Sequence, residues 1–174
     1  MGNVQISMGE MLQRVARFSD LKPFKQAFVD SLIPGHEREN FRVIGPGVSE
    51  NPDMKPPITD AHGFSLGGIR AKPGKGAALH SHTTTEVFVP FSGEWAIYWG
   101  DQGENEVVLG PLDTISVPPG VMRGFRNVGK EEAYLMVVMD GADPGRVTWS
   151  QDVLDKAVEG GIALNEKGDL PVSR

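Results

Sequence analysis

The feature that most constrains the fold is a run of short apolar segments separated by turn residues between about Thr59 and Met139. The chain has 22 glycines and 13 prolines, concentrated between the segments, as is typical of a β-sandwich or barrel and not of a helical bundle. Eight strands is the number in a jelly roll, so the sequence predicts an all-β fold. The expected strands cover 63–71, 79–82, 86–91, 94–99, 106–109, 114–117, 122–127 and 133–139.

Helical patterns flank this region. Ser7 and Glu10 have the spacing of a capping box, and the apolar residues that follow recur at helical intervals up to Phe18. A second short helix is expected between 23 and 34, and Ser150 is expected to cap a helix over 151–159. With 174 residues the chain fits one structural domain. It is expected to have a helical and irregular extension at 1–58, a barrel at 59–145 and a helix with a tail at 146–174.

One window within the barrel carries candidate metal ligands. His80 and His82 are two residues apart, so on an extended strand both imidazoles point to the same face, within chelating distance of one ion. Glu86 follows through three threonines and closes a set of two histidines and one carboxylate, which suits a divalent transition metal such as Fe, Mn, Ni or Zn. Gly74 and Gly93 bracket the window, where they relax the backbone at its ends.

This window resembles the first motif of the cupin superfamily at all five of its defining positions. A second motif lies downstream, and the run 120–129 is similar to the germin-like branch of the superfamily. The resemblance implies a single-domain small cupin, with a jelly-roll barrel (a double-stranded β-helix) and helical extensions at both ends. It also implies pairing as a homodimer. The residues that carry the second motif are Pro118, Gly120, Arg123 and Asn127.

Arg123 departs from the pattern, because the family usually has its fourth metal ligand, a histidine, at this position. A second departure is Leu112, which stands where the second motif usually begins with glycine. An arginine side chain has donors only and no lone pair for a metal, so Arg123 cannot be a ligand. Two interpretations follow. Either the remaining three residues hold a metal ion and Arg123 binds an anionic substrate, or Glu86 and Arg123 form an ion pair and no metal binds.

Two further residues are candidates for substrate contact. Phe88 has the same strand parity as Glu86 and is expected to form a pocket wall. Tyr98 is the only phenol near the site, and alternation places it on the face opposite to Trp95 and Trp99. His62 lies just before the first barrel strand. It is either a surface residue at the strand end or a replacement for the missing ligand.

Three functions remain open. The first is a metal-dependent enzyme of the dioxygenase type that acts on a small anionic organic molecule, with Arg123 orienting its carboxylate. The second is a non-catalytic sensor or binding protein for a small acid. The third is a metal-free structural cupin in which Glu86 and Arg123 are simply paired.

The charge balance argues against nucleic acid as a partner. The net charge is −6 and the isoelectric point is near 5.2, and no basic stripe is present to replace phosphate counterions. The sequence shows neither an apolar segment long enough to span a membrane nor a signal peptide, so no membrane association is expected. The absence of cysteine is compatible with a reducing compartment, and a cytoplasmic location is predicted.

Overall fold

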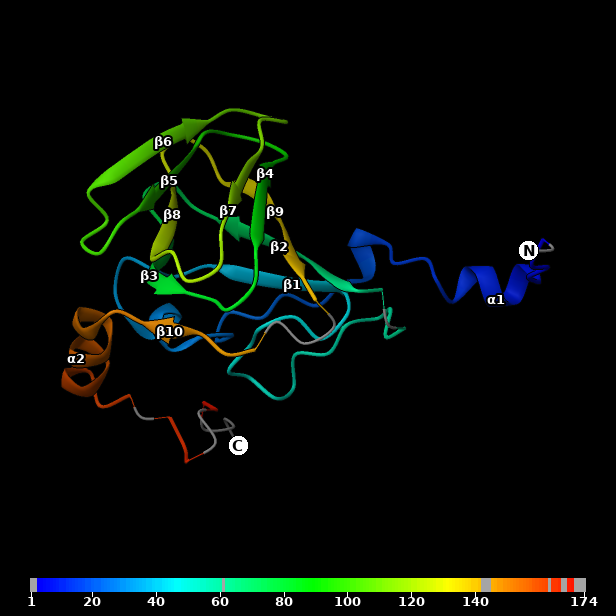
Figure 1. The fold of residues 1–174 in the computed structure, drawn as a ribbon, viewed down its shortest axis with the longest axis horizontal. Helices are drawn as coiled ribbons and strands as arrows, with labels where there is room; N and C mark the ends of the chain where they lie inside the picture. The colour runs from blue at the N-terminus through cyan, green and yellow to red at the C-terminus, as the bar shows by residue number, and fades with distance from the viewer. Residues whose placement is uncertain (1–2, 61, 142–144, 163, 167–168, 171–174) are drawn as a thin grey trace.

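Two five-stranded antiparallel sheets face each other and form the barrel of the computed structural model (Figure 1). The structure describes residues 3–60, 62–141, 145–162, 164–166 and 169–170. The first sheet has the order β1 (Glu39–Ile44), β2 (Phe64–Ala71), β9 (Ala133–Asp140), β4 (Glu86–Pro90), β7 (Ile115–Val117). The second has the order β10 (Thr148–Trp149), β3 (Gly76–Ser81), β8 (Arg123–Asn127), β5 (Trp95–Trp99), β6 (Asn105–Leu109).

The strand pattern of the sequence is confirmed. Eight strands, β2 to β9, lie within the predicted barrel region, and each overlaps one of the eight expected segments. The two flanking strands were not predicted. β1 pairs with β2 and β10 pairs with β3, so each extends one sheet by a strand contributed by the flanking chain. These additions cover sheet edges that would otherwise expose unpaired backbone groups.

The main core lies between the two sheets and is built by alternation along the strands. Phe88 of β4 and Trp95 and Ile97 of β5 are fully buried, and Phe125 of β8 packs against Phe88 and Trp95. Gly93, in the turn between β4 and β5, has φ of +69°, and a Cβ there would lie 2.6 Å from the Cβ of Ala133. The sequence prediction that this glycine relaxes the chain is therefore confirmed, because an L side chain fits neither the backbone nor the space.

The N-terminal helix is shorter than predicted. α1 (Met8–Leu12) begins with the expected capping box between Ser7 and Glu10, but it ends at Leu12 instead of continuing to Phe18. None of its residues is buried, and in Figure 1 it extends away from the barrel. A helix of this length has little stability without a packing partner, which explains its early end. The short 3-10 helix η1 (Phe18–Asp20) follows, and its Phe18 ring packs on Phe41 and Tyr134.

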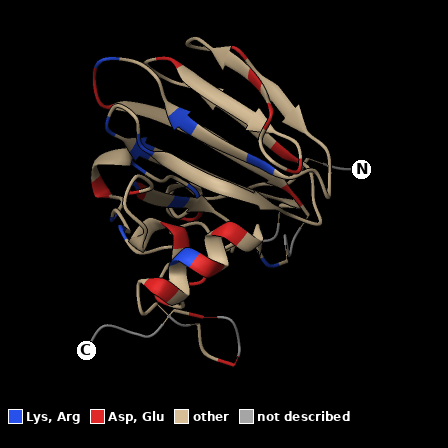
Figure 2. Ribbon diagram, turned by 90° about the vertical axis from the view of Figure 1, so that its left-hand side faces the viewer, with Lys and Arg blue, Asp and Glu red and all other residues tan. Residues whose placement is uncertain are grey.

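A second apolar cluster lies outside the barrel, where the two extensions meet β3. It joins the 3-10 helix η2 (Val29–Leu32) to α2 (Gln151–Glu159), and it includes Trp149 of β10. Val153 and Ala157, one turn apart, face this cluster, while charged residues occupy the outer side of α2 (Figure 2). Ser150 is at the N-cap position but makes no capping hydrogen bond with its side chain. Among the described residues, no helix combines the length and the apolar character needed to cross a membrane.

Candidate metal centre

Three buried side chains converge as the sequence predicts. His80 lies in β3, His82 directly follows that strand, and Glu86 is the first residue of β4. The imidazole centroids are 4.9 Å apart, and His82 Nε2 lies 3.8 Å from Glu86 Oε2. One potential ligand atom from each residue lies within 4.8 Å of the others. Because the two histidines are two positions apart on an extended chain, they share a face, and the bend at 83–84 brings Glu86 back to them.

The His80 ring is held in one tautomer. Its Nδ1 lies 2.7 Å from the carbonyl oxygen of Ala78. A carbonyl only accepts hydrogen bonds, so Nδ1 carries the proton and the lone pair is on Nε2. A backbone acceptor on the far nitrogen is the arrangement that usually orients a metal-binding histidine.

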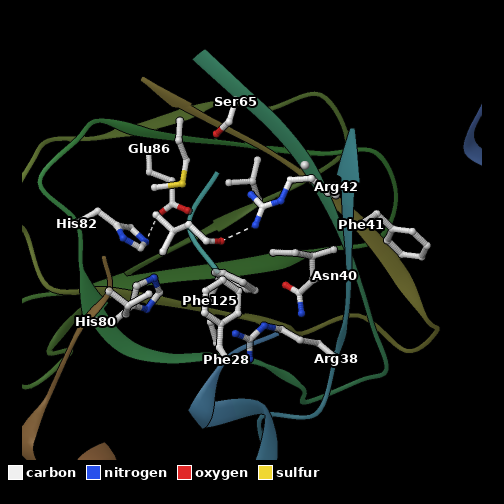
Figure 3. A pocket seen from close by; sticks show the side chains of 18 of the residues that line it. Phe28, Arg38, Asn40, Phe41, Arg42, Ser65, His80, His82, Glu86 and Phe125 are labelled. Carbon is white, nitrogen blue, oxygen red and sulfur yellow. Dashed lines mark hydrogen bonds and ion pairs between the residues drawn. The ribbon is translucent and has the colours of Figure 1, made fainter. Parts of the chain in front are cut away.

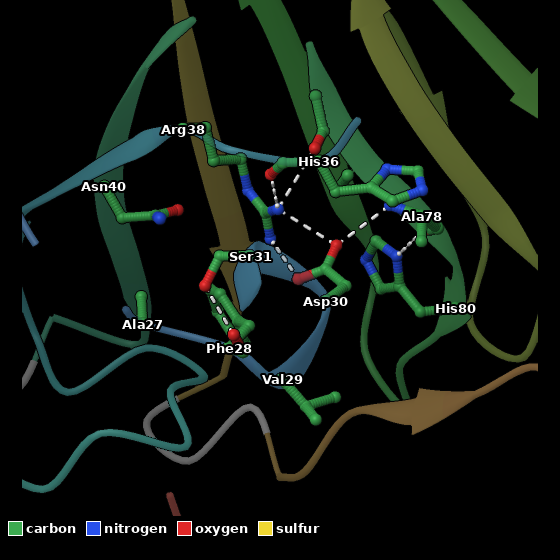
Figure 4. A network of polar contacts seen from close by, with 12 residues as sticks. Ala27, Phe28, Val29, Asp30, Ser31, His36, Arg38, Asn40, Ala78 and His80 are labelled. Atoms are coloured by element: carbon green, nitrogen blue, oxygen red, sulfur yellow. Dashed lines mark hydrogen bonds and ion pairs between the residues drawn. The ribbon is translucent and has the colours of Figure 1, made fainter. Parts of the chain in front are cut away.

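A polar network outside the barrel fixes the backbone at this point (Figure 4). The register of β3 against β8 changes between Ala77 and His80, so the regular strand pairing is interrupted at Ala78. The Ala78 N–H donates to Asp30 of η2 at 2.9 Å, while Arg38 forms two hydrogen bonds of 2.9 Å to the Asp30 carboxylate. The N-terminal extension therefore positions the strand segment that carries His80.

Both imidazoles are neutral near pH 7. Burial and the charges of His82 and Arg123 lower the pKa of His80 well below its ordinary value. Burial and the charge of Arg123 lower the pKa of His82 to about 3. A histidine binds a metal through the lone pair of its neutral form, so both rings are in the state that coordination requires.

Arg123 contacts Glu86 and is itself fully buried. Its Nε donates to Glu86 Oε2 at 2.9 Å, and its Nη1 donates to the carbonyl of Val121 at 3.0 Å. Burial raises the pKa of the Glu86 carboxyl, and the Arg123 charge opposes that change. The ion pair considered from the sequence is thus present, and it coexists with the two histidines at the same carboxylate.

The three residues fit a divalent transition metal. They supply two neutral nitrogen donors and one carboxylate, all buried, and at least one ring is oriented through its far nitrogen. Bonds to such an ion are about 2.0–2.2 Å long, so its binding would draw the donors slightly closer together than they are here. Because Arg123 stands where a fourth protein ligand would be, three protein ligands leave coordination positions for other groups.

The triad forms one wall of a pocket with a volume of about 70 Å³ (Figure 3). A single water needs about 10–15 Å³ on this scale, so the pocket has room for about five waters or one small molecule. The opposite wall comes from β1 and β2. Besides the triad, the lining includes aromatic, polar and sulfur-containing side chains, among them Phe28, Arg38, Asn40, Arg42, Met54, Ser65, Phe125, Met139 and Trp149.

The other sequence-predicted site residues do not line this pocket. Phe88 is fully buried in the core between the sheets. The Tyr98 hydroxyl donates to the carbonyl of Ala77 at 2.6 Å, and Arg126 stacks over its ring. Arg123 pairs with Glu86 and is not among the residues that line the pocket. His62 lies outside the ligand group, where its ring contacts Phe64, so nothing in its position replaces a fourth ligand.

Sequence reasoning missed the basic side of the pocket. Arg38, Asn40 and Arg42 alternate along one edge of the first sheet, and all three line the pocket. Figure 3 shows Arg42 pointing inward while Phe41 points away. Polar and apolar residues alternate only over 40–43, and no strand was predicted there. In an alternating strand the polar side chains ordinarily face water, so this pattern did not predict that Arg42 points into the pocket.

Comparisons with known proteins agree with this architecture. Residues 69–139 match the family model described as Cupin domain. No protein with a curated description matches the sequence.

Solved structures with this fold include a cupin 2 domain-containing protein from Halorhodospira halophila, at 19% identity and a TM-score of 0.54, with 71% of this chain and 78% of that chain covered. The polyketide cyclase RemF from Streptomyces resistomycificus is 16% identical with a TM-score of 0.57, and the match covers 77% of this chain and 82% of that one. An oxalate oxidase is 25% identical with a TM-score of 0.52, over 74% of this chain and 69% of that one.

The motif spacing, the two antiparallel sheets and the family match lead to the same conclusion. The chain therefore contains a small cupin domain, matched over residues 69–139, within a jelly-roll barrel.

Proposed function

We propose that this protein is a metal-dependent cupin enzyme of the dioxygenase or oxidase type, acting on a small anionic organic molecule. The observation that carries the proposal is the buried group of His80, His82 and Glu86 at the wall of a small pocket, with both imidazoles neutral. Oxalate oxidase, at 25% identity, supports a small acid as substrate. The fold alone does not identify the reaction, because a polyketide cyclase and other proteins of different activity have the same barrel.

The residues of the chain have separate roles in this proposal. His80 Nε2, His82 and the Glu86 carboxylate hold the ion, which when bound supplies Lewis-acid polarisation of a substrate oxygen or one-electron chemistry with O₂. Ala78 fixes the tautomer of His80, and Arg123 fixes the orientation of Glu86. Phe28, Met139 and Trp149 line the pocket with apolar surface and limit the water that reaches the ligand.

The test is metal content followed by turnover. Protein purified without an affinity tag is expected to contain close to one equivalent of a transition metal by elemental mass spectrometry. The His82→Ala variant is expected to lose it, whereas His62→Ala is the matched control and is expected to retain it. Oxygen uptake with a panel of short hydroxy, oxo and dicarboxylic acids then identifies the reaction. Metal binding that survives His82→Ala would contradict the assignment of the ligands.

One observation favours a second function. The ion pair between Arg123 and Glu86 places a permanent positive charge beside the candidate ion, which opposes metal binding. In a metal-free protein the same pocket would bind a small acid without turnover. Absence of metal after reconstitution with Fe(II), Mn(II), Ni(II) and Zn(II), combined with measurable binding of short acids, would support this binding protein over the enzyme.

A further inference from the structure

Three arginines are buried in the part of the chain that the structure describes, and one of them differs from the other two. Arg38 is paired with Asp30, and Arg123 is paired with Glu86. Arg42 is 8% exposed and has no carboxylate partner among the described residues. It is therefore the one described buried arginine whose charge is not balanced by the protein.

An unbalanced buried guanidinium is unfavourable. Burial lowers the pKa of Arg42 to about 10, which still leaves the side chain charged at neutral pH. Removing such a charge from water without a counter-charge is strongly unfavourable. An anion entering the pocket would supply the missing counter-charge.

The guanidinium of Arg42 is held by one hydrogen bond to the backbone, and one of its buried N–H donors has no partner in the described structure. Nη2 donates to the carbonyl of Val48 at 2.6 Å and approaches the sulfur of Met54 at 3.9 Å. Nε has no hydrogen-bond partner in the described structure. Gly47 lies against the group with φ of +52°, and a Cβ at this position would come within 1.5 Å of Nη1. The 45–48 loop is thus shaped around the guanidinium, and its Nε donor is left without a partner in the described structure.

Sheet order places Arg42 across the pocket from the metal ligands. β1 and β4 belong to the same sheet and are separated by β2 and β9. Arg42 is in register with Gly67 of β2, whose lack of a side chain opens space above the sheet. Ser65, Met139 and Glu86 form the adjacent row across β2, β9 and β4. The pocket thus has a cation at one end and the triad at the other, with about 70 Å³ between its walls.

We propose that Arg42 is the anion-binding residue of this pocket and that it takes the carboxylate of a short hydroxy or oxo acid. The fork of an arginine binds a carboxylate through two parallel hydrogen bonds, and the volume limits the ligand to about four to six non-hydrogen atoms. The second oxygen-bearing end of the acid lies toward His80, His82 and Glu86. Only this second contact rests on the proposed function, because the carboxylate contact to Arg42 needs no metal. Arg123, considered for this role from the sequence, is paired with Glu86 and does not line the pocket.

The test measures binding of glycolate and oxalate by calorimetry to wild-type protein and to Arg42→Gln, each in metal-free and metal-loaded form. Glycolamide, the neutral analogue of glycolate, is the ligand control. Arg126→Gln is the protein control, because it makes the same chemical change at an exposed arginine outside the pocket. Arg42→Gln is expected to bind both acids 10- to 100-fold more weakly, with its metal content unchanged. Arg42→Lys, which keeps the charge but loses the fork, is expected to bind with intermediate affinity, and Arg126→Gln to bind as the wild type does.

The outcomes separate this inference from the proposed function. Equal acid affinity in wild type and Arg42→Gln, or no measurable binding of either acid to wild type, would overturn the role of Arg42. Binding of glycolamide as tight as that of glycolate would overturn it as well. If the protein holds no metal but acid binding still depends on Arg42, the enzyme proposal fails and the anion site stands. If Arg42→Gln does not fold, the comparison of Arg42→Lys with wild type decides, because equal affinities there would contradict binding by the fork.

Discussion

Arg123 and Glu86 form a buried ion pair of 2.9 Å, and Glu86 is at the same time the carboxylate of the candidate metal centre. The pair links β8 to β4 across the two sheets, and it lies beside His80, which is opposite Arg123 in the strand register. Glu86 can thus be balanced by Arg123 alone or by Arg123 together with a metal ion. We therefore expect the affinity of this site for a metal to depend on the residue at position 123.

Arg123→His is expected to tighten metal binding. The change removes a positive charge beside the ion and places an imidazole opposite His80. At about 5 Å and an effective dielectric of 20, one unit charge repels a divalent ion by about 6–7 kcal/mol before screening, so a gain of at least about a hundred-fold in affinity is expected. Competition titration of Zn(II) or Mn(II) against a chelator measures the change, with Arg126→His as the control on the outer surface. An unchanged affinity would mean that position 123 does not influence the centre.

Arg38→Gln and Arg42→Gln are expected to differ in stability although both remove a buried arginine. Arg38→Gln leaves the fully buried Asp30 carboxylate without its partner and is expected to lose about 3–5 kcal/mol. Arg42→Gln leaves no carboxylate unpaired and is expected to lose less than about 1 kcal/mol. Thermal unfolding measures both, and a difference of at least about 4 °C in melting temperature is expected from roughly 2–4 °C per kcal/mol. Equal losses would show that Arg42 has a counter-charge in the folded protein.

Acid is expected to destabilise the metal-free protein through its two buried histidines. Because the folded pKa values of His80 and His82 are lowered, the unfolded chain binds protons first as the pH falls below about 6.5. Each histidine then removes about 1.4 kcal/mol of stability per pH unit until its folded pKa is reached, which for His82 is about 3. Urea unfolding between pH 7.5 and 5 measures the slope.

The control for the acid effect is a comparison of variants. The slope is expected to fall in His82→Gln and to stay unchanged in His62→Gln, whose ring lies outside the ligand group. A slope that is the same in wild type and His82→Gln would show that His82 is already protonated in the folded state.

Leu112→Gly is expected to stabilise the protein. Among the described residues, Leu112 is the one non-glycine with positive φ, at +71°, and its side chain is 74% exposed. An L residue in this conformation costs about 1–2 kcal/mol, while glycine adds back some entropy of unfolding, so a net gain of about 0.5–1 kcal/mol is expected. The melting temperature should rise by about 1–4 °C. Leu112→Ala keeps the backbone strain and is the control, and a gain of the same size in it would assign the effect to the exposed side chain.

Leu112 stands where the second motif usually has glycine, and its backbone conformation bears on this difference. The second motif usually begins with glycine here, and the structure shows that the backbone still adopts the conformation that glycine favours. The turn is held by hydrogen bonds from the Leu112 N–H to Pro90 and from the Gly110 N–H to the Asp113 carboxylate. The conformation of the turn is therefore set by its surroundings and not by the residue at this position.

The N-terminal region shows where sequence patterns were insufficient. The apolar periodicity up to Phe18 predicted one amphipathic helix, but α1 ends at Leu12 because no surface of the described protein packs against it. Similarly, the run 39–44 was not identified as a strand, because its pairing with β2 supplies the order that local propensity does not.

The sequence alone determined the barrel and the candidate metal ligands, because both depend on short-range rules. Strand lengths follow from the spacing of glycine and proline, and the shared face of His80 and His82 follows from the two-residue period of an extended chain. Only the tertiary structure decided which distant polar residues meet the triad. Arg42 and Glu86 are brought to one pocket by the order β1-β2-β9-β4, and Arg123 is kept out of it by its ion pair. The physical reason is that sheet order and charge pairing involve residues far apart in the chain, which no local pattern records.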